Sequence, residues 1–171
     1  LNLGKLRKEE NILWSFAPHD ISMILSLIND VPKRTYTKPC VFINKNIPDV
    51  TTTHMEFKNN IHAQIFVSWL HPYKEQKLIV IGSKGMIVLD DQKKKDEKLF
   101  FYPHKIKFED GNLRAIKAKG RYIKFKEIEP LRNECLHFLK CIVFNEKCIT
   151  DGDEGLRVLD VLEQAQQSMS I

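Results

Sequence analysis

The sequence predicts an α+β fold in which an open, mostly antiparallel β-sheet carries helices packed on one face. Three observations lead to this prediction. An amphipathic helical pattern stands near the start, a central run of about six segments is rich in β-branched and aromatic residues, and two helical patterns close the chain. This grouping of strands between helices differs from the regular strand–helix alternation of parallel α/β sheets.

The first helix is predicted to open at Pro18, because a proline loses no helical hydrogen bond in the first turn. The residues after it repeat at i, i+3, i+4 and i+7, which is one apolar helix face: Ile21, Ile24, Leu25 and Ile28. The stretch at 29–32 contains Asn, Asp and Pro and is expected to end this helix.

The predicted strands cover residues 40–43, 51–57, 61–69, 77–81, 86–89, 99–102 and 122–125. Turn residues at 58–60 and 82–85 predict two hairpins. A polar loop around 109–112 is expected between the last two strands.

The end of the chain is predicted to be helical again. Pro130 opens one helix, and Asp151 with its neighbours caps the last one. That last helix carries Leu156, Leu159, Leu162 and Ala165. Because no low-complexity linker interrupts the 171 residues, we expect a single domain over residues 1–171.

Composition excludes several classes of protein. With 43% hydrophobic and 29% charged residues, the chain is neither disordered nor collagen-like. Its longest aliphatic runs, 78–81 and 86–89, are four residues long, so no membrane-spanning helix and no membrane partner are expected. The chain starts with Leu1 and not with methionine, which suggests a piece of a longer polypeptide. It shows no secretory signal, and we expect a cytoplasmic protein.

Positive charge is concentrated in one band at residues 93–126, which has a net charge of +8 although the whole chain has +5. Such a band can bind nucleic acid or a phosphate-bearing ligand. It can equally be a solvated, lysine-rich sheet edge, where charges prevent edge-to-edge pairing. The band lacks the aromatic spacing or zinc pattern of a nucleic-acid module, so we favour the solvated edge and expect no nucleic-acid partner.

The cysteines are Cys40, Cys135, Cys141 and Cys148. None forms a C-x-x-C pair, and the two on the predicted 130–144 helix are six residues apart, on different faces. We therefore expect reduced thiols of a cytoplasmic protein, without a disulfide framework and without a metal site.

The segment 10–21 contains the most informative residues. It places His19 directly after Pro18, in the first turn of the predicted helix, where unpaired N–H groups and the macrodipole disfavour imidazolium. A neutral histidine can act as a general base, although Asp20 beside it favours the protonated form. From spacing alone, we favour a histidine that only caps the helix or satisfies a buried carbonyl.

This segment, together with S-W-L-H-P-Y-K at 68–74, G-S-K-G-M at 82–86, D-D at 90–91 and E-P-L at 129–131, resembles the C-terminal domain of the Gfo/Idh/MocA family. The resemblance runs from about Asn2 to the last helix. It implies a glyceraldehyde-3-phosphate dehydrogenase-like C-terminal domain of a two-domain oxidoreductase. In such enzymes NAD or NADP is bound mainly by an N-terminal Rossmann domain, which is absent from this chain. The C-terminal domain supplies part of the substrate pocket and forms homo-oligomers through its sheet face.

The form W-S-F-A-P-H-D-I at 14–21 resembles the branch that oxidises nucleotide-activated sugars, for example at C3 of a UDP-N-acetylaminosugar. By this resemblance His19 matches the catalytic histidine. The resemblance also suggests the substrate-binding residues, with Arg7 directed at a substrate phosphate: Asn11, Trp14, Ser15, Asp20 and Arg7.

Two departures from the family pattern stand out. Ser15 occupies a position where many members have an aspartate, and a neutral hydroxyl cannot stabilise imidazolium as a carboxylate would. Neither G-x-G-x-x-G nor the family's Glu-Lys-Pro motif occurs in the chain, so we expect this chain alone to be inactive. Two other functions remain open: a non-enzymatic subunit-assembly module that uses the sheet face, and a basic nucleic-acid-binding domain based on residues 93–126.

Overall fold

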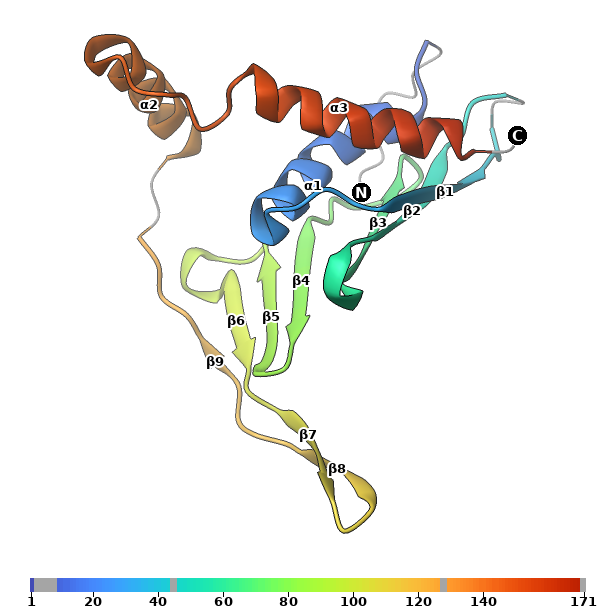
Figure 1. Ribbon diagram of the computed structural model, residues 1–171, viewed down its shortest axis with the longest axis vertical. Helices are drawn as coiled ribbons and strands as arrows, with labels where there is room; N and C mark the ends of the chain where they lie inside the picture. Colours follow the sequence, from blue (N-terminus) through green and yellow to red (C-terminus); the bar gives the residue numbers. More distant parts are fainter. Residues whose placement is uncertain (2–8, 44–45, 127–128, 170–171) are drawn as a thin grey trace. The chain divides into compact units, whose positions relative to one another are not determined.

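The computed structural model describes residues 1, 9–43, 46–126 and 129–169 and divides into two compact units (Figure 1). The helix–sheet unit comprises Leu1–Tyr73 and Cys135–Ile171, and the strand unit comprises Lys74–Glu134. All strand pairs in the described ranges are antiparallel, which confirms the predicted α+β class. That the two units form one domain over residues 1–171 stays a prediction.

The helix–sheet unit is built on a three-stranded sheet with the order β1-β2-β3. Its elements are α1 (Ile12–Ile28), β1 (Arg34–Cys40), β2 (Val50–Glu56), the 3₁₀ turn η1 (Lys58–Asn60), β3 (His62–Ser68) and α3 (Gly152–Gln167). Helices α1 and α3 pack against each other and on the same face of this sheet, as the sequence predicts (Figure 1).

Alternation along the strands decides which residues face the helices. In β2, Thr51, Thr53 and Met55 are buried, and the residues between them face the opposite side. Two of the inward threonines, Thr37 of β1 and Thr53 of β2, lie opposite each other and share a hydrogen bond of 2.9 Å between their hydroxyls. The fully or nearly buried apolar residues of this core are Ile12, Leu13, Ala17, Ile21, Ile24, Leu25, Met55, Phe57, Ile65, Val67, Trp69, Val161, Leu162 and Ala165.

Helix α1 begins at Ile12, so the predicted start at Pro18 is wrong. Asn11 caps the helix, because its side-chain oxygen accepts hydrogen bonds from the backbone N–H groups of Leu13 (3.0 Å) and Trp14 (3.3 Å). Pro18 therefore lies inside the helix, where it removes one backbone hydrogen bond. Burial of the helix on both sides of Pro18 offsets this loss, and His19 consequently lies outside the first turn.

Helix α2 (Pro130–Phe144) begins at the predicted proline but contains no buried residue. The start of α3 is also as predicted, since the carboxylate of Asp151 accepts a hydrogen bond from the backbone N–H of Glu154 at 3.0 Å. Of the apolar residues predicted on α3, Leu162 and Ala165 are buried, whereas Leu156 and Leu159 are exposed. No helix in the described part of the chain is long and apolar enough to cross a membrane.

The strand unit contains two further sheets instead of a continuation of the first. Strands β4 (Lys77–Gly82), β5 (Gly85–Asp90), β6 (Leu99–Tyr102) and β9 (Arg121–Tyr122) form one sheet in this order, with the 3₁₀ turn η2 (Lys95–Glu97) before β6. Strands β7 (Lys105–Glu109) and β8 (Asn112–Ile116) form a separate hairpin.

The turn predicted at 109–112 is present, but the sequence predicts no strands directly beside it, whereas the structure has the β7–β8 hairpin there. Asp110 and Gly111 in this turn adopt positive φ angles (52° and 77°), as tight hairpin turns require. Two predicted strands also differ from the structure. The strand predicted at 40–43 lies at 34–40; its inward residues are threonines, so the sequence shows no apolar alternation there. The strand predicted at 122–125 is shorter in the structure, where β9 covers only Arg121–Tyr122.

A pair of leucines on α1 tests the core. Leu25 is fully buried and Leu27 is 60% exposed, so Leu25→Ala leaves a cavity whereas Leu27→Ala does not. We expect Leu25→Ala to lower the free energy of unfolding by about 2 to 5 kcal/mol and Leu27→Ala by less than about 0.5 kcal/mol. Urea denaturation followed by circular dichroism measures both, and equal effects would contradict the described packing of α1.

Candidate functional site

The outer face of α1 forms a polar stripe opposite the buried one. Ser15, His19, Ser22 and Ser26 follow one another at the spacing of a single helix face. His19 is exposed, and the other stripe residues are half-buried or exposed. The imidazole is therefore accessible for proton transfer. Because His19 lies beyond the first turn of α1, the expected influence of the helix macrodipole does not apply to it.

Asp20 lies between this polar stripe and the core. Its neighbours one turn away, Ala17 and Ile24, are both buried, which leaves Asp20 half-buried. Burial raises the pKa of the Asp20 carboxyl, while the positive chain terminus and His19 act in the opposite direction. A carboxyl whose charge is disfavoured, directly beside an accessible histidine, is typical of functional sites.

Asn11 and Trp14 use their polar groups within the chain. The Nδ2 of Asn11 donates a hydrogen bond to Oε1 of Gln166 on α3 at 2.8 Å, and the indole Nε1 of Trp14 donates to the same oxygen at 3.0 Å. These contacts dock the start of α1 on α3. No local sequence pattern points to Gln166, because Asn11 and Trp14 lie 155 and 152 positions away from it.

Ser15 is held by a carboxylate that the sequence analysis assigned no role. Its hydroxyl donates a hydrogen bond to Oε1 of Glu10 at 2.8 Å. Ser15 lies one turn before His19 on the same stripe, so the polar stripe has a negative charge at its start although the family's aspartate is missing. The structure thus places Ser15 and His19 one turn apart on the same side of α1, whereas Asp20, next to His19 in the sequence, lies further round the helix toward the core. Arg7, the last predicted substrate ligand, lies outside the described residues.

The glycine-containing turn at 82–85 has a structural role. Gly85 adopts a φ of +139°, and an added Cβ would collide with the backbone carbonyl of Tyr102. Strand β5 follows this turn, not a helix, so the turn does not offer the helix N-terminus of a phosphate-binding loop. Trp69 is buried in the core of the helix–sheet unit.

The basic band lies in the strand unit, with Lys105, Lys107, Arg114 and Arg121 on strands and its other basic residues in turns and loops. Lys105, Lys107 and Arg114 share one face of the β7–β8 hairpin, and part of their charge is close to Glu109. Lys98 forms an ion pair with Asp91 at 2.9 Å. Most of these side chains are exposed, and the prediction that they form a solvated surface and not a nucleic-acid site stays a prediction.

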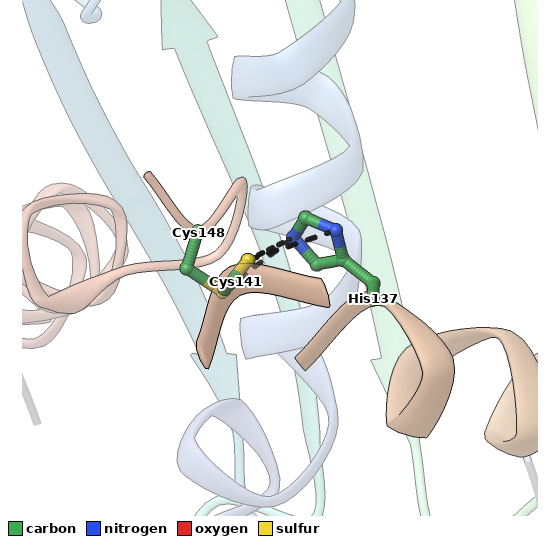
Figure 2. Close-up of side chains that lie close together, drawn as sticks. All are labelled: His137, Cys141 and Cys148. Atoms are coloured by element: carbon green, nitrogen blue, oxygen red, sulfur yellow. Dashed lines mark hydrogen bonds between the residues drawn. The ribbon is translucent and has the colours of Figure 1, made fainter. Parts of the chain in front are cut away.

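Two groups of metal-ligating side chains occur among the described residues. His137, Cys141 and Cys148 meet at the end of α2, as Figure 2 shows. His54, Glu56 and His62 meet on the outer face of the β1–β3 sheet. Cysteine spacing predicts no metal site, because neither the lack of a C-x-x-C pair nor helix periodicity reveals that Cys148 lies beside His137 and Cys141.

The chain is similar in sequence to one protein family and in fold to several solved structures. A family profile described as the GFO/IDH/MocA C-terminal domain matches residues 4–88. The chain is similar to UDP-N-acetylglucosamine 3-dehydrogenase from Acidithiobacillus ferrooxidans, with a TM-score of 0.74 and 17% identity over 94% of this chain and 48% of that one. It is also similar to aldose-aldose oxidoreductase from Caulobacter crescentus, with a TM-score of 0.71 and 15% identity over 93% of this chain and 45% of that one.

At these identities the likeness establishes the fold, and the chain spans about half the length of both structures. No curated protein gives a significant match.

Asp20 gives a pH-dependent prediction. The pKa of Asp20 in the folded chain is raised above 3.8, the ordinary value that applies to the unfolded chain. At pH values between the unfolded and the folded pKa, the folded chain therefore binds more protons than the unfolded chain. Stability therefore falls as the pH rises through this window, and the non-ionising Asp20→Asn variant should be more stable than the wild type at pH 7.

The gain should vanish below pH 3.8, where Asp20 is protonated in both states. Urea denaturation at several pH values measures the difference, with Asp160→Asn on the exposed face of α3 as the control. A variant less stable than the wild type at pH 7 would contradict the raised pKa.

Proposed function

The chain belongs to the Gfo/Idh/MocA family through its C-terminal domain, and from this premise we propose that it is the substrate-binding and oligomerisation domain of an NAD(P)-dependent oxidoreductase. The proposed reaction oxidises a sugar hydroxyl, namely C3 of a UDP-N-acetylaminosugar. The single observation that carries this proposal is the accessible His19, which stands on the polar stripe of α1 beside a half-buried carboxyl. The fold likeness to a UDP-N-acetylglucosamine 3-dehydrogenase supports the substrate class.

In the proposed reaction His19 handles the proton of the sugar hydroxyl. Its imidazole is accessible and lies within one turn of Ser15 on the same side of α1. The carboxylate of Glu10, which accepts the hydrogen bond from Ser15, supplies negative charge near this stripe, in place of the aspartate that many family members have. The carboxyl of Asp20 is the second one near His19. It can form hydrogen bonds to the substrate or orient the imidazole ring of His19.

The dinucleotide is proposed to bind mainly to a Rossmann domain outside this chain. The residues described here do not fit a dinucleotide cradle, because the turn at 82–85 leads into a strand. NAD or NADP would accept the hydride from the sugar carbon. The present chain contributes the proton-handling side chain and part of the sugar site, and four free cysteines support a cytoplasmic setting.

The outer face of the β1–β3 sheet is the proposed oligomer interface. Tyr36 and Phe66 are each 48% exposed on this face, and Tyr36 stacks on His54 with ring centroids 5.1 Å apart. Aromatic rings on an exposed sheet face favour association, because they remove apolar area from water when two faces meet. An assembly module without catalysis would use the same face, and the test of His19 separates the two functions.

The catalytic proposal predicts the effect of His19→Asn in the protein that joins this domain to its dinucleotide-binding domain. The variant should lower kcat for UDP-N-acetylglucosamine oxidation by about 10² to 10⁴-fold, because it removes a general base. The KM should change little, since the proton transfer occurs in the transition state. Absorbance of the reduced nicotinamide measures the rate.

His104→Asn is the matched control, because His104 is an exposed histidine of the strand unit. Near-normal turnover of His19→Asn would exclude a catalytic role for His19 and would favour the assembly module.

The oligomer proposal predicts that charge on the sheet face separates the subunits. The double variant Tyr36→Asp/Phe66→Asp should be monomeric in sedimentation velocity, while the wild type is a dimer or larger. Leu27→Asp introduces the same charge at an exposed site on α1 and should leave the oligomer intact. A monomeric wild type, or an oligomer that survives both aspartates, would contradict the proposal.

A further inference from the structure

Three potential metal ligands come together because the chain reverses after α2. His137 and Cys141 are one turn apart on this helix, so both side chains point to the same side. Asn145 follows the helix with a positive φ of 53°, and the N–H of Glu146 donates to the carbonyl of Cys141 at 3.1 Å. This left-handed end turns the chain back and brings Cys148 beside the other two residues (Figure 2).

The two nitrogen–sulfur distances in this cluster match those of a tetrahedral metal site. The Nε2 of His137 lies 3.6 Å from the Sγ of Cys141 and 3.6 Å from the Sγ of Cys148. All three ligand atoms lie within 4.8 Å of one another. In a tetrahedron with Zn–S of about 2.3 Å and Zn–N of about 2.05 Å, the nitrogen and sulfur ligands are about 3.6 Å apart. Both nitrogen–sulfur distances thus fit a shared ion.

We propose that His137, Cys141 and Cys148 bind one Zn²⁺ ion, with a fourth position open to water or to a ligand outside this group. Two thiolates and one imidazole form a donor set that selects thiophilic ions with tetrahedral geometry. On binding, each thiol loses its proton to solvent and each sulfur forms a bond to the ion. The ion also takes the Nε2 lone pair, which now accepts a hydrogen bond from the N–H of Ile149 at 3.1 Å.

The site has a structural purpose in this fold. Helix α2 has no buried residue, so its packing contributes little to holding it in place. A bound ion would join the last turns of α2 to the loop that leads into α3. Cys148 also lines a surface hollow whose other lining residues include Lys147, Asp151, Asp153 and Arg157, so the ligand group reaches solvent on this side.

Cobalt substitution tests the proposal directly on the reduced, chelator-treated chain. Co²⁺ should bind at one equivalent per chain, with the visible bands of tetrahedral cobalt and a near-ultraviolet thiolate-to-cobalt charge-transfer band. Added Zn²⁺ should abolish these bands. A fully reduced chain without the charge-transfer band would overturn the proposal, as would a band of purely octahedral, nitrogen–oxygen type.

Matched variants identify the ligands. Cys141→Ser, Cys148→Ser and His137→Ala should each weaken Co²⁺ binding by more than about 100-fold, since even loss of a supporting contact costs 10 to 100-fold. Cys135→Ser, an exposed cysteine on the same helix, should bind as the wild type does. His54→Ala controls for the group on the sheet face. Binding lost with His54→Ala but kept with Cys148→Ser would overturn the assignment.

A measurement on the wild type keeps the test valid if a variant does not fold. Zn²⁺ should protect Cys141 and Cys148 from alkylation while Cys135 reacts, as read by peptide mass spectrometry. Equal alkylation of all three thiols with and without Zn²⁺ would overturn the proposal. A Cys141–Cys148 disulfide in the chain before reduction, combined with no protection after reduction, would assign the pair to thiol oxidation instead.

Discussion

Burial of one face of α1 against the β1–β3 sheet and α3 is the constraint on which the helix–sheet unit depends. The buried stripe fixes the rotation of the helix about its axis, and this rotation places the polar stripe with His19 on the outside. Two side chains of α1, Asn11 and Trp14, meet Gln166, which fixes the position of α1 along α3. The exposure of His19 is therefore a consequence of core packing, and no further contact is required to keep this side chain on the outside.

Periodicity was enough to predict the fold class, because period 2 and period 3.6 dominate long stretches of this chain. The predicted start of α1 and the predicted position of β1 are wrong, because in each case a second local effect outweighed the sequence pattern. Pro18 satisfied the rule for a helix start, but Asn11 with its cap and the apolar residues after it extended the helix through the proline. Strand β1 was misplaced because its inward residues, Thr35 and Thr37, are polar, so burial there does not produce an apolar alternation.

The candidate sites show the same limit in three dimensions. Ser15, His19 and Asp20 are local to one helix, and the sequence predicts them as site residues through their resemblance to a family. Gln166 could not be found, because its partners Asn11 and Trp14 are far from it in sequence. The group of His137, Cys141 and Cys148 was missed for a different reason: it depends on the left-handed residue that ends α2, and helix periodicity stops there.

The residues around His19 share a property that core packing does not explain. Pro18 removes a helical hydrogen bond inside α1, and Asp20 is a half-buried carboxyl whose charge is disfavoured. Each is locally unfavourable, and both adjoin an exposed imidazole that contributes nothing to the core. Sequences tend to violate local rules at functional sites, where another requirement outweighs stability. Two residues of this kind, one on each side of His19 on a helix otherwise well capped and well packed, distinguish this turn of α1 from the rest of the helix–sheet unit.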